Sequence, residues 1–353
     1  MDRIKMFALI IFVNFIICGT AKGQTPLYVK HADNSIIIPG TLIKEKLKID
    51  KESKGEVDPL SRVSMPGYVS VHEPGNMIFV AYSRRNKIEI YDTDLNYVGI
   101  VDEKTINYKW PIGVIARKDG NFLITDKGLN SVTWFDNNAN KLTEIKIMPS
   151  GLFSPAMFNK EGNMVVYKAD NDGLFAVYNI KGEKISQFGE VLESRYPEQK
   201  NNFWNNWFNN VHFTIDNNGY LFCAFIDNPV LRTYDPDGNL VCEVDYWNIT
   251  GIKKRYDDWL FEYKTRVEKE IKEGRTSYRG KIFVSNISVD DKYVYIKFNV
   301  KYSPIYLFNK EDYTLIKTIE LGNSPGVSFN ATSKDYIYSS LGDGFLARYK
   351  KSK

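Results

Sequence analysis

The sequence has few of the residues that most often build catalytic metal sites. Among its 353 residues there are 3 histidines and 3 cysteines. A zinc site usually takes three or four ligands, so this supply argues against a zinc enzyme. No loop has the closely spaced aspartates of a dedicated calcium site, and no signature nucleophile, phosphate-binding loop or cofactor fingerprint occurs in the sequence. We therefore expect neither a bound metal nor a cofactor.

One-sided charge and long apolar segments are also scarce. The formal net charge is only +4, which argues against nucleic acid as a partner. After the first 17 residues, no apolar run approaches the roughly 20 residues that a membrane-spanning helix needs. The 43% hydrophobic and 14% aromatic residues are nevertheless ample for a core. We expect a globular protein with no transmembrane span in its mature chain.

Residues 1–23 have the pattern of a secretory signal peptide. Arg3 and Lys5 precede an apolar run over 6–17, and small residues lead to a cleavage point before Gln24. This pattern predicts export to the periplasm or the cell exterior.

An alternative for the same segment is a lipoprotein anchored through Cys18. Ile17 disfavours it, because a lipid-attachment site has a small residue at that position. In either case we expect residues 24–353 to form a single domain.

A turn that opens a strand occurs six times in the remaining chain. The copies are "EPGNMIFVAY", "KDGNFLITD", "KEGNMVVYK", "NNGYLFCAF", "DDKYVYIKF" and "SKDYIYSSL", which begin at 73, 118, 160, 217, 290 and 333. A second repeated feature, an aromatic residue followed by an acid or amide, comes about ten residues after each turn. The spacings between its copies follow the spacings between the turns. Its first five copies are Tyr91-Asp92, Phe135-Asp136, Tyr178-Asn179, Tyr234-Asp235 and Phe308-Asn309.

A repeat of about 43 residues with four short strands is typical of a β-propeller blade. We name the strands of each blade a, b, c and d in chain order, and the six copies predict an all-β, six-bladed propeller. The last copy ends before its strand d. The segment "TLIKEKLKI" at 41–49 closely resembles the strand d "TLIKTIEL" at 314–321, so we expect this N-terminal strand to close the ring.

The repeats resemble those of the NHL-repeat and TolB-like propeller families. The resemblance rests on "PGNMIFVAYSRRNKIEIYD", "DGNFLITDKGLNSVTWFD" and "EGNMVVYKADNDGLFAVYN" and covers nearly all of the mature chain. It implies a six-bladed ring. Similar rings include lactonases and lyases with metals or histidines at the channel, as well as proteins that only bind.

The two remaining cysteines fall on one predicted blade. Cys223 lies on strand b and Cys242 on strand d, so strand c separates them and they should lie about 10 Å apart, beyond the reach of a disulfide. We predict two buried free thiols.

Two insertions mark the predicted binding face. In an antiparallel blade the b–c loops and the d-to-a crossings emerge on one face, and both insertions, 189–210 and 247–281, are d-to-a crossings. The first brings Arg195, Trp204 and Trp207 together with many asparagines, which suits a sugar or a peptide. The alternative is that its rings pack on the second insertion, whose apolar spacing predicts a helix that serves as a lid or brace.

The other candidate ligand-binding residues lie in the b–c loops of this face and at its channel mouth. They are Arg84, Arg85, Asp126, Lys127, Asp170, Asp227, Tyr302, Asp343 and His212. The competing interpretation is that the charged loops are simply solvated and that the histidine is packed in the interior.

Two functions follow from these observations. The first is a non-catalytic binding or scaffolding propeller, expected to be a monomer, whose partner is a protein, a peptide or a glycan. The second is a propeller hydrolase or lyase, for which Asp126, Asp170 and Asp227 offer carboxylates near the channel. No catalytic residue is assigned, so whether the chain is an enzyme stays open at this point.

Overall fold

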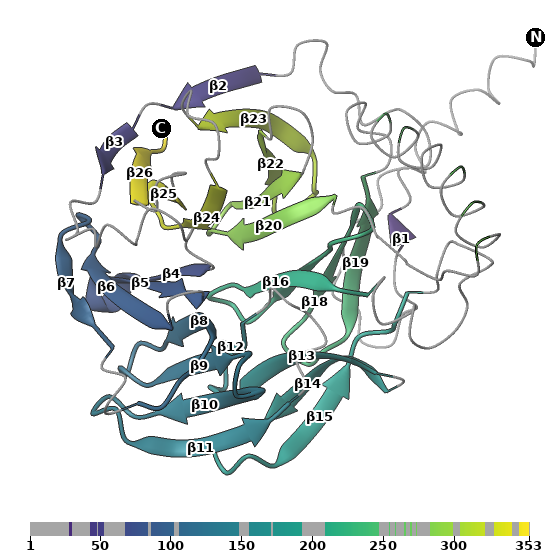
Figure 1. The fold of residues 1–353 in the computed structure, drawn as a ribbon. Helices are drawn as coiled ribbons and strands as arrows, with labels where there is room; N and C mark the ends of the chain where they lie inside the picture. Colours follow the sequence, from purple (N-terminus) through teal and green to yellow (C-terminus); the bar gives the residue numbers. More distant parts are fainter. Residues whose placement is uncertain are drawn as a thin grey trace, which may run out of the picture.

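The computed structural model has six sheets arranged in a ring (Figure 1). The residues that it describes are 28–29, 43–47, 49–52, 68–83, 86–101, 106–147, 155–170, 172–192, 209–246, 283–298, 304–321, 328–340 and 346–352, with isolated positions between 254 and 273. The prediction of an all-β, six-bladed propeller is confirmed.

The first three blades each contain four strands. Blade 1 consists of β4 (Tyr68–His72), β5 (Met77–Tyr82), β6 (Lys87–Asp92) and β7 (Tyr97–Ile100), with the 3-10 turn η2 (Glu73–Gly75) between the first two. Blade 2 consists of β8 (Pro111–Ala116), β9 (Phe122–Asp126), β10 (Ser131–Phe135) and β11 (Lys141–Lys146). Blade 3 consists of β12 (Met157–Phe158), β13 (Met164–Asp170), β14 (Gly173–Tyr178) and β15 (Lys184–Phe188).

The other three blades recruit strands from the N-terminal segment. Blade 4 consists of β16 (Val211–Ile215), β17 (Leu221–Phe225), β18 (Val230–Tyr234) and β19 (Leu240–Asp245), with β1 (Tyr28–Val29) at its edge. Blade 5 consists of β20 (Val284–Val289), β21 (Tyr293–Phe298), β22 (Ile305–Asn309) and β23 (Leu315–Leu321), with β2 (Ile43–Leu47) at its edge. Blade 6 consists of β24 (Ser328–Thr332), β25 (Tyr336–Ser340), β26 (Leu346–Lys350) and β3 (Ile49–Glu52).

The core lies between blades rather than within any one of them. Six clusters of buried apolar side chains occur in the described part of the chain, one for each pair of neighbouring blades. Tyr91, Phe135, Tyr234 and Phe308, the aromatic members of the repeated pair, are buried in these clusters. Their recurrence is therefore explained by packing, because two sheet faces about 10 Å apart need large flat side chains to fill the gap.

The acid or amide after each aromatic shapes the turn between strands c and d. Asp136 Oδ1 accepts the backbone N–H groups of Asn138 (2.9 Å) and Asn140 (2.8 Å). Asp235 makes the same two bonds with Asp237 (3.0 Å) and Asn239 (2.8 Å). In the repeated pair, the aromatic residue thus packs in the core and the acid or amide that follows it stabilises the c–d turn through a side-chain oxygen.

The ring closes as predicted, but the closing strand lies further along the chain than expected. β3 pairs antiparallel with β26, placing Ile49 opposite Tyr349 and Glu52 opposite Ala347. Most of the predicted closing segment, 41–49, instead forms β2, which pairs parallel with β23 on the outside of blade 5 (Figure 1). Residues 43–47 therefore lie beside β23, the strand d that they resemble. They do not form the strand d of blade 6, which is β3.

Arg348 connects the three elements that meet at the closure. Its guanidinium donates to Asp50 of β3 (2.9 Å from Nε) and to the turn of blade 1, where the acceptors are Thr93 O and Asp94 Oδ1 (both 2.7 Å). The ring of Tyr336 lies 4.2 Å below the guanidinium carbon. One side chain from β26 thus links the first and last blades through the N-terminal strand.

The predicted pair of free thiols is confirmed. Cys223 and Cys242 are buried and unpaired on β17 and β19, with β18 between them. Burial raises the pKa of the Cys223 thiol, so it should not react at neutral pH.

Several predicted segments lie mainly or wholly outside the described residues. These are the signal peptide 1–23 with Cys18, most of the insertion 189–210, and most of the helical insertion 247–281. In the last, Lys254, Asp258, Thr265 and Lys269 are helical, and the Glu273 N–H donates to Lys269 O (3.0 Å). No helix in the described ranges is both long and apolar enough to cross a bilayer.

We predict that Arg348→Met lowers the free energy of unfolding by about 2 kcal/mol, because it removes charged hydrogen bonds to Asp50, Thr93 and Asp94 at the closure. Urea denaturation followed by circular dichroism measures this value. Lys141→Met is the control, because the Lys141–Glu144 pair is on the surface of β11 and should contribute less than about 1 kcal/mol. Equal losses in the two variants would contradict the proposed role of Arg348 in closure.

Candidate functional site

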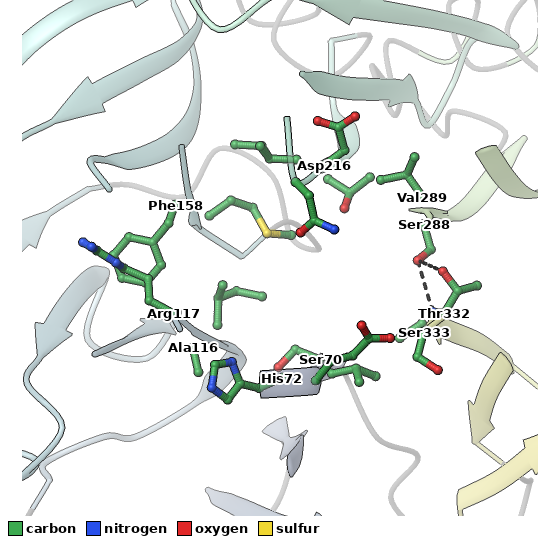
Figure 2. Close-up of a pocket in the computed structure, with 18 of the residues that line it drawn as sticks. Ser70, His72, Ala116, Arg117, Phe158, Asp216, Ser288, Val289, Thr332 and Ser333 are labelled. Carbon is green, nitrogen blue, oxygen red and sulfur yellow. Dashed lines mark hydrogen bonds between the residues drawn. The ribbon is translucent and has the colours of Figure 1, made fainter. Parts of the chain in front are cut away.

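A cavity of about 720 Å³ occupies the centre of the ring. Strand a of every blade lines it, together with the a–b turns at one end, and Figure 2 shows side chains from several blades around the open space. Its volume is in the range of small-molecule sites. The lining includes His72, Arg117, Phe158, Asp216, Ser288 and Thr332.

The local sequence explains why polar side chains gather at this end. Asp216 Oδ1 accepts the N–H groups of Asn218 and Tyr220 (both 2.9 Å), and Asp290 Oδ1 accepts those of Lys292 (2.9 Å) and Tyr293 (2.8 Å). An acid at the end of strand a thus forms the a–b turn with one oxygen. Its second oxygen is held at the mouth of the channel.

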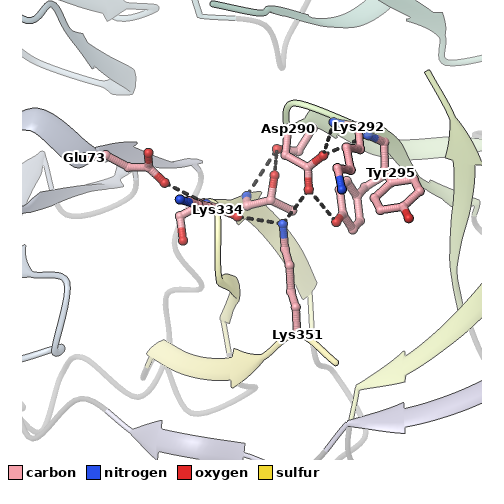
Figure 3. Close-up of polar contacts among 10 residues, drawn as sticks. Glu73, Asp290, Lys292, Tyr295, Lys334 and Lys351 are labelled. Carbon is pink, nitrogen blue, oxygen red and sulfur yellow. Dashed lines mark hydrogen bonds and ion pairs between the residues drawn. The ribbon is translucent and has the colours of Figure 1, made fainter. Parts of the chain in front are cut away.

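The second oxygen of Asp290 is neutralised by Lys351 (Figure 3). Asp290 Oδ2 accepts from Lys351 Nζ and from Tyr295 OH (both 2.7 Å), and Lys351 Nζ also donates to Ser333 O (2.6 Å). Burial raises the pKa of Asp290, but the hydrogen bonds and the positive charge of Lys351 outweigh burial and hold it below its usual value. The carboxylate is therefore charged and paired at neutral pH.

Two more ion pairs occur around the same opening. Asp216 pairs with Lys310, whose ammonium lies 5.7 Å from the Phe222 ring. Arg117 pairs with Asp119 (3.1 Å) while its guanidinium lies 5.3 Å above the Phe158 ring. Three of the four aspartates at this mouth thus have cationic partners, and the remaining one is Asp291.

Arg117 is held in place by the next blade. Its Nη1 donates to Gly162 O (3.1 Å). A Cβ atom on Gly162 would lie 2.3 Å from that nitrogen, and the residue has a φ of +82°. Glycine is therefore favoured in this turn for its backbone conformation, and a larger residue would also displace the guanidinium from its place beside the turn.

Hydroxyl groups and a neutral imidazole complete the lining. Ser288 Oγ and Thr332 Oγ1 lie 2.9 Å apart and join blades 5 and 6. His72 is buried, and its burial lowers its pKa despite the opposing effects of the Ala116 backbone and Asp119. At neutral pH the imidazole is uncharged, so it can offer a hydrogen bond but little positive charge.

The cavity therefore offers mainly hydrogen-bonding groups and paired charges, and its lining also includes Glu73, Asp291, Lys118, Lys160 and Lys334. The paired side chains have little net charge to offer a ligand, whereas the hydroxyls and amides can donate and accept. In the described part of the chain, no three His, Cys, Asp or Glu side chains cluster closely enough to hold a metal ion.

Asp126, a predicted ligand-binding residue, has a structural position. It is buried, and its carboxylate accepts the N–H groups of Lys109 (2.6 Å), Trp110 (3.0 Å) and Leu129 (2.8 Å). These bonds fix the b–c loop to the segment that precedes β8. The neighbouring Lys127 places its ammonium 4.9 Å from the Trp110 ring.

Asp227 lies in a different environment. It is buried in the b–c loop of blade 4, and this desolvation raises its pKa to about 7. His212 is half-buried at the start of β16, at the same end of blade 4, and Asp170 ends β13. Neither Asp227 nor His212 lines the central cavity.

The other predicted site residues lie outside the described part of the chain. They are Arg84, Arg85, Arg195, Trp204, Trp207, Tyr302 and Asp343.

The sequence analysis missed the residues at the a–b end of the channel. Their signal was present in the repeated turns, where a polar or charged residue recurs at the end of strand a, as in Arg117, Asp216 and Asp290. These residues lie at or directly before the start of the aligned turns, and equivalent positions in a ring meet at a common mouth.

Comparison with solved structures finds this fold at low sequence identity. A Bacteroides fragilis protein assigned as exported has a TM-score of 0.56 and 12% identity, over 89% of this chain and 100% of that chain. A streptogramin B lyase has a TM-score of 0.50 and 11% identity, over 86% and 87%. Virginiamycin B lyase from Staphylococcus aureus has a TM-score of 0.50 and 8% identity, over 82% and 96%. These similarities concern the fold alone.

No family model matches the sequence, and no curated protein matches it either.

We predict that Asp126→Asn destabilises the protein by about 1–3 kcal/mol, because an amide has one acceptor oxygen and turns an N–H group toward backbone donors. Urea denaturation measures the loss. Asp136→Asn is the matched control, because Asn179 and Asn309 already fill the equivalent turn position in blades 3 and 5, and it should cost less than about 0.5 kcal/mol. If Asp126→Asn is as stable as this control, the carboxylate does not have the structural role assigned to it.

Proposed function

We propose that this protein is an exported, non-catalytic binding propeller that holds a polar part of a glycan, a peptide or a partner protein at the a–b end of its channel. One observation carries this proposal: three of the four aspartates at that mouth are held in ion pairs, and hydroxyl and amide groups share the lining with them. Binding sites of this kind recognise ligands by hydrogen bonds and shape rather than by charge.

The pairing disfavours Asp216 and Asp290 as catalytic bases. A general base or nucleophile needs a free proton-accepting group in reach of a substrate. Asp290 is charged but bonded to Lys351 and Tyr295, and Asp216 is paired with Lys310. Such groups give a rigid, preorganised rim, which favours binding because little ordering is needed when a ligand arrives.

Export is supported by the signal-peptide pattern of residues 1–23. A protein assigned as exported shares the fold over its whole length. The resemblance to NHL-repeat and TolB-like propellers is part of the same proposal.

The insertion-bearing face is a second surface in this proposal. Its aromatic and amide residues, with Trp204 and Trp207 at the centre, suit a sugar or peptide. The two faces of the ring are separate, so variants can test each one.

We predict that Arg117→Gln weakens ligand binding about tenfold, because the shorter amide has fewer N–H donors and does not reach the position of the guanidinium at the channel rim. The measurement is binding of the labelled protein to defined glycan and peptide arrays, followed by titration of the strongest ligand. Tyr97→Ala, a change on the exposed edge strand β7, is the control and should bind like the wild type.

The double variant Trp204→Ala/Trp207→Ala tests the insertion-bearing face in the same assay. Unchanged binding by Arg117→Gln together with a loss in the tryptophan variant would move the site to that face. A protein that binds neither array would contradict the proposed function.

A lyase is the second candidate, and Asp227 is the observation that favours it. A buried carboxyl group whose pKa is about 7 is suited to general acid–base chemistry at neutral pH. The fold is shared with streptogramin B and virginiamycin B lyases. One structure of the latter is of a catalytically inactive histidine-to-alanine variant with quinupristin, and His212 lies at the same end of blade 4 as Asp227.

We predict that Asp227→Asn is more stable than the wild type above pH 7. The pKa of Asp227 is about 7 in the folded protein against an ordinary value of 3.8, so between these values the unfolded chain releases a proton that the folded protein keeps. Wild-type stability therefore falls as pH rises through this window, by about 4 kcal/mol at most. The amide variant escapes this loss.

Urea denaturation at about pH 4, 5.5, 7 and 8 follows the difference between the two proteins. It should be near zero at the lowest pH and should level off above pH 7. Asp237→Asn, on an exposed turn, is the control for removing an acidic group from the chain. A streptogramin B lyase activity that Asp227→Asn abolishes would favour the lyase over the binding protein.

A further inference from the structure

A second cavity, of about 530 Å³, lies between blades 4 and 5. On the blade 4 side its wall is the sheet face that carries Tyr220, Phe222 and Val241. On the blade 5 side it is bounded by the a–b and c–d turns, with Tyr293 and Tyr313 among the lining residues. We call this cavity the interblade cleft.

The interblade cleft adjoins the central cavity. Asp216 and Asp291 line both spaces, and in Figure 2 Asp216 lies at the edge of the central opening. Because the cleft extends from strand a to strand d of blade 4, a ligand that fills both spaces must be elongated, with one part at the channel axis and another between the blades.

The inner wall of the cleft is rigid. Tyr313 OH and Thr233 Oγ1 lie 2.6 Å apart, which joins blade 5 to blade 4. Tyr313 has a φ of +58° although its bulky side chain is buried. A left-handed conformation is unfavourable for such a residue, and the packing of its ring into the core offsets the strain.

The groups that remain for a ligand are flat rings and amides. Tyr220 and Tyr293 are half-buried, so each ring is partly accessible. Asn218 and Asn309 have amides that can donate and accept. Asp216 and Lys310 neutralise each other, while Asp291, Glu311 and Lys292 leave no strong excess of either sign.

This combination selects among ligand classes. A polyanion or polycation would find no opposing charge large enough to offset its desolvation. A flat apolar ligand would leave the amides and carboxylates unbonded. A sugar ring has an apolar face for a tyrosine and hydroxyls for the amides, so it satisfies both kinds of group.

We propose that the interblade cleft is a subsite for a neutral sugar unit, so that the protein binds an oligosaccharide that extends from the channel into the space between blades 4 and 5. This inference rests on the proposed function, because it assigns a second subsite to the same ligand. It predicts that the affinity rises with the length of the oligosaccharide. It also predicts that the interblade cleft contributes to the affinity only for the longer oligosaccharides.

The test uses isothermal titration of the full chain with cello-, malto-, xylo- and chito-oligosaccharides of one to six units. We expect at least one series in which the hexamer binds about tenfold or more tightly than the monosaccharide. Tyr220→Ala should reduce the hexamer affinity about tenfold and leave the affinity for the shortest binding member unchanged. Tyr220→Phe should restore it, because the phenyl ring keeps the stacking surface.

Controls separate a lost subsite from a lost fold. Asn218→Ala changes an exposed residue of the a–b turn, so it tests the cleft even if Tyr220→Ala does not fold. Tyr97→Ala on β7 should not change any affinity.

The outcomes distinguish this inference from the proposed function. If affinity is independent of chain length, or if the Tyr220 and Asn218 variants bind the hexamer like the wild type, the cleft is not a sugar subsite, although channel binding stands. If none of the four series binds while a peptide does, the ligand class is wrong. If Arg117→Gln leaves binding of every member unchanged, the channel site itself fails.

Discussion

The structure depends on the closure of the ring between β26, β3 and blade 1. Each blade buries both faces against its neighbours, and the first and last blades can do so only when the circle is complete. β3 supplies the last strand, and Arg348 joins it to blade 1 through Asp50, Thr93 and Asp94. Because the circle is complete, the six a strands face one axis. The polar ends of these strands can then form a single site, although they are more than 200 residues apart in the chain.

The fold could be predicted because its signals are local and repeated. The aromatic–acid pair recurs because each blade needs a large core ring and each c–d turn needs an oxygen, as Phe135 and Asp136 illustrate. The position of the closing strand is not a local property. Residues 43–47 and 49–52 are adjacent and both form strands, yet one adds parallel to β23 and the other antiparallel to β26. The similarity of 41–49 to a strand d correctly indicated that this segment forms a strand in a sheet. It did not indicate which strand of the ring it would pair with.

The site was harder to predict because the same residue type has opposite environments in similar loops. Asp126 ends strand b of blade 2 and Asp227 lies just after strand b of blade 4, and both are buried. Asp126 is surrounded by backbone N–H groups brought in from 109–110, whereas burial alone determines the raised pKa of Asp227. The difference comes from segments remote in sequence. At the opposite end of the channel, Asp216 and Asp290 form hydrogen bonds within the a–b turns, which the sequence of the turns indicates. The same residues also line the channel, which follows only from the closed ring.

Asymmetry in this ring is concentrated around blade 4. It is flanked by the two long crossings, it has β1 at its outer edge, and it forms one wall of the interblade cleft. It also has Asp227 at one end and Asp216 at the other. Blade 5 also has an added edge strand, β2, so edge strands alone do not set blade 4 apart. The coincidence of both long crossings with a cavity that adjoins the channel is the asymmetry on which the proposed ligand subsite rests.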